Sequence, residues 1–157
     1  MEKYILSFIK VCESVFRDFC STEVKAGKVF YLTKENRDMG WDISGIIGLS
    51  GQISGAVSLS MKDNVAFKVT KTLTGIDHNA FDADVIDAIG EIINIITGNI
   101  KKEFEASYKT AISIPSIVQG KGHRLIWPSK NIRIICIPFF IFSDEEVFIS
   151  IAVDEAK

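Results

Sequence analysis

Apolar side chains recur every three or four residues in three stretches of the chain, which is the spacing of helices that bury one face. These stretches are residues 2–20, 62–74 and 82–106. In the last of them, apolar residues cover more than half of the helix circumference when successive residues are placed about 100° apart. The pattern therefore predicts two amphipathic helices and one long helix that is embedded on most of its sides.

Runs rich in β-branched residues predict strands between and after these helices. Glycines interrupt the alternating pattern of the second run, which therefore reads as two strands joined by a tight turn near Ser50–Gln52. Proline inside an apolar run, as at Pro115 and Pro138, indicates a sheet edge, a bulge or a strand start. The predicted strand regions are residues 28–34, 42–60, 110–118, 132–142 and 147–153.

The order of the predicted elements is a helix, three strands, two helices and three more strands. Both halves begin with a helix and end in a strand–turn–strand unit, which suggests an internal duplication of pattern rather than of residues. We therefore predict an α+β fold with two long helices packed on an antiparallel β-sheet of about six strands, with pseudo-twofold internal duplication. A length of 157 residues fits a single domain that spans residues 1–157.

Composition narrows the classes of function. The chain is 47% hydrophobic and 24% charged, which is ordinary for a globular protein. Its net charge of -2 at pH 7 argues against nucleic acid as a partner, because nucleic-acid binding needs a clustered basic excess. No apolar run approaches the roughly 20 residues of a membrane span, and the first residues lack the apolar core of a signal peptide. We expect a cytoplasmic protein without a membrane segment.

The cysteines and histidines give little reason to expect a metal site. Cys12 and Cys136 lie in apolar runs, where cysteine behaves as a small buried hydrophobe, and the chain has no C-x-x-C pair. The two histidines, His78 and His123, are far from any cysteine in the sequence. We predict that no metal ion or cofactor is bound by this chain, and that His78 is a surface residue of a loop.

The long helix leaves one narrow line of polar and small residues uncovered. We call this line the polar seam; it comprises Asp84, Asp87, Glu91, Asn94, Gly98, Lys101 and Glu105, with Gly90 beside it. A merely solvated face explains the charged residues. It does not explain the glycines, each of which costs a helix about 1 kcal/mol relative to alanine. Glycine is useful where another backbone must approach closely, so the polar seam is also a candidate contact surface for a partner.

Glu91 and Asn94 are the residues of the polar seam whose side chains could take part in binding or catalysis. They are three positions apart, so both point the same way from the helix. No serine or cysteine is paired with a histidine here, which argues against a nucleophilic mechanism. A carboxylate can instead pair with a cation on a partner. A carboxamide can hold a water molecule in line with an electrophile, as a glutamine does in GTPases.

The motif Asp87-x-x-x-Glu91-x-x-Asn94, followed some twenty residues later by Pro115, resembles the signature of the CheC/CheX/FliY family of chemotaxis response-regulator phosphatases. CheC-type members of that family carry one copy of the motif in each half. In the first helix of this chain, Phe16 stands where the second asparagine would be required. A single motif therefore resembles the CheX branch. The gap between Asn94 and Pro115 is slightly shorter than the family pattern.

The resemblance implies a substrate, a division of roles and an assembly. The substrate would be the aspartyl phosphate of phospho-CheY, with Asn94 positioning the attacking water and Glu91 pairing with a lysine of the regulator. Mg²⁺ would be held by the regulator and not by this chain, and Asp87, Gly90 and Gly98 would contact the partner. Members of the CheX branch are homodimers joined through edge strands. Residues 132–142 are a candidate edge, and burial of that strand within its own sheet is the equal alternative.

Two other functions remain open at this point. One is a non-catalytic module of the same fold that binds a response regulator or dimerises; the other, weaker, is a component of the flagellar switch. The glycine-rich residues 45–55 lack a phosphate-binding pattern and fit turns and bulges of a hairpin. The polar residues 119–131 fit a solvated excursion, with Trp127 packed into the core.

Overall fold

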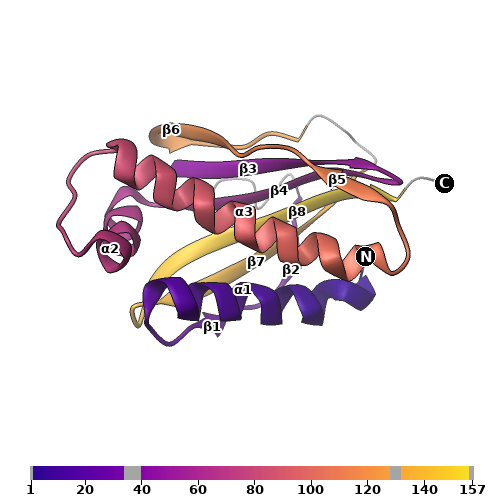
Figure 1. Ribbon diagram of the computed structural model, residues 1–157, viewed down its shortest axis with the longest axis horizontal. Helices are drawn as coiled ribbons and strands as arrows, with labels where there is room; N and C mark the ends of the chain where they lie inside the picture. The colour runs from indigo at the N-terminus through magenta and orange to yellow at the C-terminus, as the bar shows by residue number, and fades with distance from the viewer. Residues whose placement is uncertain (1, 34–39, 128–131, 156–157) are drawn as a thin grey trace.

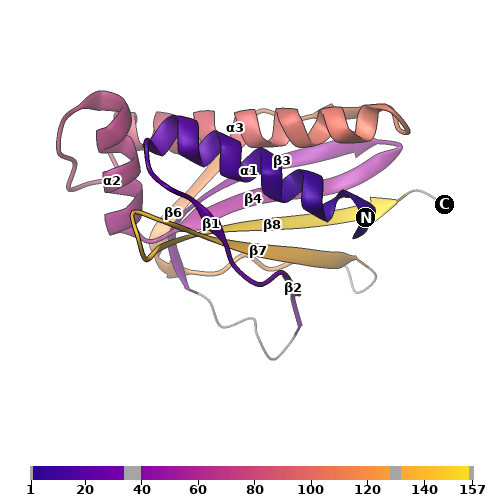
Figure 2. The same ribbon diagram turned by 90° about the horizontal axis from the view of Figure 1, so that it is seen from below.

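The structure is a computed structural model that describes residues 2–33, 40–127 and 132–155. Helices cover one face of a large antiparallel sheet (Figures 1 and 2). The helical segments are η1 (Glu2–Tyr4), α1 (Ile5–Cys20), α2 (Asp63–Thr74) and α3 (Ala83–Glu105). All three predicted helices are therefore confirmed nearly to the residue. None of the helices in the described ranges is both long and apolar enough to cross a bilayer.

The described residues form eight strands, all paired antiparallel. They are β1 (Lys25–Ala26), β2 (Phe30–Tyr31), β3 (Trp41–Gly51), β4 (Ile53–Met61), β5 (Thr110–Ile112), β6 (Ser116–His123), β7 (Arg133–Ile141) and β8 (Glu145–Glu155). The order is β1-β7-β8-β4-β3-β5, with β2 also on β7 and β6 also on β3. The α+β class is confirmed.

The strand count exceeds the predicted six for two local reasons. Of the strand predicted at 28–34, only Phe30–Tyr31 forms a strand, β2, and residue 34 lies outside the described residues; β1 is a further short strand that precedes the predicted one. The strand predicted at 110–118 is interrupted before Ser116, next to Pro115, which has no N–H to donate to a ladder. It then continues as β6 through residues 119–123, which were predicted to be a solvated excursion; residues 119–122 are exposed as predicted, but they form a strand.

The topology has the predicted pseudo-twofold character. The hairpin β3–β4 matches the hairpin β7–β8, and β4 pairs with β8 at the centre of the sheet. The short strands that follow α1 pair with β7, whereas those that follow α3 pair with β3. Each half thus gives its first strands to the hairpin of the other half. Since β7 has neighbours on both sides, residues 132–142 do not form a sheet edge, and the alternative of a strand buried within its own sheet is correct.

Residues of the sheet alternate between two different faces. In β4, Val57, Leu59 and Met61 are buried in the main core beneath the helices, while Ser58 and Ser60 point to the opposite face. The helices lie above that core in Figure 2. The opposite face has a smaller apolar cluster made of Trp41, Ile134, Cys136, Phe148 and Ala152, with Trp127 packed against it.

Gly45 of β3 sets how closely α3 approaches the sheet. A Cβ atom at this position would lie 2.9 Å from Cγ2 of Ile93 and 3.4 Å from Cγ2 of Ile89, both fully buried on α3. Such distances are too short for a β-branched side chain that is fixed by its neighbours. Glycines of this region were predicted to serve turns, which holds for Gly51 with its φ of 116°, but Gly45 serves helix–sheet packing.

The start of α3 is tied to the end of α2 by a chain of side chains. Asp82 is the N-cap, and its Oδ1 accepts a 3.0 Å hydrogen bond from the backbone N–H of Val85. Its Oδ2 lies 2.9 Å from Nδ1 of His78, whose Nε2 lies 2.9 Å from Oγ1 of Thr74. The hydrogen bond from His78, followed by that from Val85, lowers the pKa of Asp82. The side chain of His78 is only 2% exposed, so it is not a surface residue.

The close packing at Gly45 gives a first prediction. Gly45→Ala should lower the free energy of unfolding by about 1–3 kcal/mol, because the new methyl group overpacks against Ile93. Gly48→Ala on the same strand is the control, since its Cβ would lie 3.5 Å from the nearest atom, Oγ of Ser113. Urea denaturation measures both. Equal midpoints for the two variants would contradict the role given to Gly45.

The Asp82 cap gives a second prediction, which depends on pH. Because the pKa of Asp82 is lower in the folded than in the unfolded chain, its carboxylate stabilises the fold above the unfolded pKa of about 3.9, and this stabilisation is lost as the pH falls through the folded pKa. Asp82→Ala should therefore lower the thermal midpoint clearly near neutral pH and much less in strong acid. Asp77→Ala, which removes an exposed carboxylate paired with Lys71, is the control. A deficit for Asp82→Ala that does not change with pH would refute this assignment.

Candidate functional site

The polar seam of α3 is exposed as predicted. Asp87, Glu91 and Asn94 are exposed, while Ile89, Ile92, Ile93 and Ile96 on the other sides of the helix have no exposed surface. At its far end the seam carries an ion pair in which Nζ of Lys101 lies 2.9 Å from Oε1 of Glu105. The apolar sides of the helix are therefore fixed in the core, and Glu91 and Asn94 face outward with the other polar residues of the seam.

The first part of the seam, from Asp84 to Asn94, forms the floor of an open groove of about 780 Å³. One wall comes from the end of α2, through Leu73 and Thr74, and the other from Pro115 and Ile117 beside and within β6. Figure 1 shows β6 running alongside the first half of α3, with α2 near the start of that helix. The groove brings together three segments that are distant in sequence around Glu91 and Asn94.

Gly90 and Gly98 occupy different environments. Gly90 is buried, and a Cβ atom there would lie 3.8 Å from Cγ of Pro115 and 4.0 Å from Cδ1 of Ile117. Alanine would fit at this position, but a larger side chain would push against the wall of the groove. A Cβ at Gly98 would meet no atom within 4 Å. Gly90 thus lets the β5–β6 segment lie close over the helix, whereas Gly98 leaves the surface of the helix open.

The charged residues that line the groove are all acidic, namely Asp84, Asp87 and Glu91. Within the described part of the chain, Glu91 and Asn94 make no hydrogen bond or ion pair with other side chains. The groove therefore favours a positively charged group of a partner. It does not attract a phosphoryl group by charge, since none of its described lining residues is a cation.

The chemistry available at the groove is that of one carboxylate and one carboxamide. Thr74, His78 and Asp82 form a chain that resembles the order of a catalytic triad. However, Oγ1 of Thr74 also lies 3.1 Å from the carbonyl oxygen of Thr70, and Asp82 caps α3. These bonds make the chain a structural link between two helices. The ligand atoms of His78, Asp82 and Asp84 lie within 4.8 Å of one another, but both ring nitrogens of His78 are already engaged.

Sequence reasoning found the polar residues of the groove but missed its apolar walls. Leu73 and Ile117 line the groove and were not predicted, because tertiary packing brings α2 and β6 beside α3 and neither residue carries a local signal. Ile86, which is half-buried on α3 itself, also lines the groove. The described part of the segment 119–131, residues 119–127, does not line the groove. Trp127 lies in the cluster on the opposite face of the sheet, and residues 128–131 fall outside the described residues.

The chain resembles known proteins over most of its length. A family model described as chemotaxis phosphatase CheX matches residues 43–140. The CheY-P phosphatase CheX of Thermotoga maritima is 27% identical over 140 residues, which are 87% of this chain and 86% of that protein.

Two crystal structures extend the likeness to the whole fold. The chemotaxis protein CheX from Vibrio vulnificus superposes with a TM-score of 0.85 at 28% identity, covering 97% of this chain and 99% of that one. The CheX–CheY–BeF3–Mg²⁺ complex from Borrelia burgdorferi contains a chain that superposes with a TM-score of 0.79 at 24% identity, covering 97% and 98%. This chain therefore belongs to the CheX family of CheC-like chemotaxis phosphatases and is a homologue of a phospho-aspartyl protein phosphatase.

Proposed function

We propose that this protein accelerates hydrolysis of the aspartyl phosphate of a CheY-type response regulator and so terminates a chemotaxis signal. The observation that carries the proposal is the exposed pair Glu91 and Asn94, adjacent on a helix whose other sides are fixed in the core. Membership of the CheX family supports the class of reaction. The groove around the pair supports a protein as the substrate, since it is open and wide.

Asn94 is proposed to position the attacking water. An acyl phosphate is already reactive, so the barrier lies largely in placing water in line with the phosphorus atom and the leaving carboxylate oxygen. The carboxamide offers both a donor and an acceptor, which can fix the orientation of a water molecule. Attack forms a new P–O bond to water, breaks the P–O bond to the aspartyl carboxylate and releases inorganic phosphate. The rigid backbone of α3 supports this role, because it limits the freedom of the side chain.

Glu91 is proposed to pair with a lysine of the regulator and thereby fix the register of docking. The acidic lining of the groove, with Asp84 and Asp87 beside Glu91, supports a cationic partner group. Three carboxylates near a phosphoryl group would otherwise oppose binding. The negative charge of the phosphoryl group must then be neutralised by groups of the regulator, and Mg²⁺ held by the regulator would supply the positive charge. The Borrelia burgdorferi complex, which includes CheY, BeF3 and Mg²⁺, supports that placement.

Asp87, Gly90 and Gly98 are proposed to shape the docking surface. Gly98 leaves the helix open to a partner backbone, and Gly90 lets Pro115 lie low over the helix so that the groove stays accessible. Gly90 would thus affect binding of the regulator through the position of the groove wall, whereas Gly98 would contact the regulator directly. Asp87 adds charge beside Glu91.

The main alternative is a module that binds a regulator without hydrolysing its phosphate. The presence and exposure of both Glu91 and Asn94 favour the phosphatase. We further propose that residues 1–157 act as one domain, that the protein is cytoplasmic, and that it forms a homodimer. One sheet that includes every described strand supports the single domain. A homodimer through strand pairing would use the β6 edge in place of the predicted 132–142, because β6 pairs with β3 alone.

Asn94→Ala tests the role of the carboxamide. The variant should slow release of phosphate from a phosphorylated CheY-type regulator by about 100-fold, because water is no longer held in line. Binding of the regulator, measured by isothermal titration in the presence of Mg²⁺ and a phosphoryl mimic, should be retained. Asn99→Ala on the same helix is the matched control, since Asn99 does not line the groove. Activity of Asn94→Ala within a few-fold of wild type would remove Asn94 from the mechanism.

Glu91→Gln tests the pairing with a lysine. The amide keeps the shape of the side chain but removes its charge, so KM for the phosphorylated regulator should rise about tenfold while kcat changes less. The effect should diminish at high salt, where the wild-type pair is screened. Glu103→Gln provides the control on the same helix. A fall in kcat with unchanged KM would assign Glu91 to chemistry rather than to docking.

A further inference from the structure

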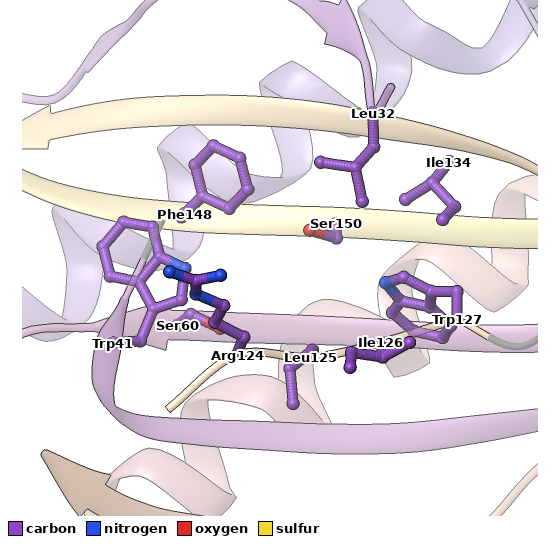
Figure 3. A pocket seen from close by; sticks show the side chains of 10 residues that line it. All are labelled: Leu32, Trp41, Ser60, Arg124, Leu125, Ile126, Trp127, Ile134, Phe148 and Ser150. Carbon is purple, nitrogen blue, oxygen red and sulfur yellow. The ribbon is translucent and has the colours of Figure 1, made fainter. Parts of the chain in front are cut away.

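A second cavity lies on the face of the sheet opposite the helices (Figure 3). Its volume is about 150 Å³, and the sheet separates it from the groove of α3. None of the described residues that line it also lines the groove of Glu91 and Asn94. Ile126, one of its lining residues, is 81% exposed, so the cavity opens to solvent on one side.

The cavity exists because small side chains meet on this face of the central strands. Ser60 of β4 and Ser150 of β8 line it and are only 2% and 7% exposed. The opposite sides of the same strands carry large aliphatic residues such as Leu59 and Ile149. At these positions the large side chains of the two strands point toward the helices and the serines point toward the cavity. This leaves a hollow with a floor of hydroxyl groups.

Aromatic rings form the walls of this hollow. Trp41 and Phe148 stand at one end with ring centroids 5.3 Å apart and an interplanar angle of 30°, and Trp127 stands at the other end (Figure 3). Flat walls of this kind favour a planar ring over a branched aliphatic molecule, because the ring can stack on them. A cavity of about 150 Å³ is large enough for one benzene-sized ring.

The polar groups of the cavity favour an acid. Since a carbonyl oxygen only accepts, Nδ1 of His123 donates to the oxygen of Gly120 at 2.8 Å, and the tautomer with its proton on Nδ1 accepts from Ser44 through Nε2 at 2.8 Å. The hydroxyl of Ser44 then accepts a hydrogen bond from the hydroxyl of Ser60, with the two oxygens 2.6 Å apart. Ser60 therefore has no proton left to donate to a ligand.

Ser150 is left as the hydroxyl of the floor that can donate to a ligand, since its described partner is the sulfur of Cys136 at 3.8 Å, a weak acceptor. Of the described residues that line the cavity, Arg124 alone carries a charge, and its guanidinium lies at the Trp41 end (Figure 3). A donor hydroxyl and a cation at the edge of an aromatic cavity match a carboxylate on a planar ring.

We propose that this cavity is a binding site for a small planar aromatic acid. The ring lies between the tryptophan walls over the serine floor, and its carboxylate faces Arg124 and Ser150. The site is independent of the phosphatase groove, so binding does not require a phosphorylated regulator.

Benzoate is the probe for this site, and the protein reports its own occupancy. The two tryptophans of the chain, Trp41 and Trp127, both line the cavity. Benzoate should change their fluorescence in a saturable way, with a Kd on the order of a millimolar for so small a ligand. It should also raise the thermal midpoint of unfolding, because it binds the folded state. Acetate at equal concentration controls for ionic strength, and toluene tests the ring without the charge.

Variants distinguish binding of benzoate in the cavity from binding elsewhere on the surface. Ser150→Leu fills the floor and should abolish the response to benzoate, whereas Ser54→Leu, on β4 but outside the lining, should leave it unchanged. Arg124→Met keeps the length of the side chain and should weaken benzoate to the level of toluene. The proposal is overturned if wild type shows no saturable response to benzoate, if toluene binds as tightly as benzoate, or if Ser150→Leu, folded by its melting curve, still responds.

Discussion

The packing of α3 against β3 is the constraint on which the site depends. Four consecutive turns of α3 place fully buried isoleucines on the sheet, and Gly45 removes the side chain that would hold the helix away. Close contact on that side leaves no freedom for the helix to roll. The direction in which Glu91 and Asn94 point is therefore set by apolar packing beneath them, and not by polar contacts of their own. A site of this kind is preorganised by its support rather than by its reactive groups.

The helices and the polar residues of the site could be predicted from sequence, and the reason is periodicity. A long run of isoleucine with a polar line at alternating intervals of three and four admits only one kind of helix, with Glu91 and Asn94 on the open side. The walls of the groove could not be predicted, because Leu73 comes from α2 and Ile117 from β6, and the place of both elements beside α3 depends on tertiary contacts such as the pairing of β6 with β3. Likewise, the position of β7 within the sheet depends on which distant strands pair with it, and an apolar run is compatible with both an edge and an interior strand.

The roles of the glycines depend on tertiary contacts that the local sequence pattern does not reveal. The helix glycines drew attention because they weaken a helix, and one of them, Gly98, does face open space. The glycine with the tightest helix–sheet constraint, Gly45, stood in a run that reads as turns. Only the position of Ile93 above it distinguishes close packing from a bend. His78 is a similar case. Its position in a loop suggested exposure, but its side chain is buried where it hydrogen-bonds to Thr74 at the end of α2 and to Asp82 at the start of α3.

The exchange of strands between the two halves has a consequence for how the chain must be made. The strand β2 pairs with β7, about one hundred residues later, and β4 completes its pairing only when β8 arrives at the very end of the described chain. A nascent chain that has emerged as far as α2 therefore holds its first hairpin without the neighbours on either side. Contacts of such high sequence separation slow folding, since the intervening loop must close before they stabilise anything. The two halves resemble each other in pattern, yet each depends on strands of the other half to complete its part of the sheet.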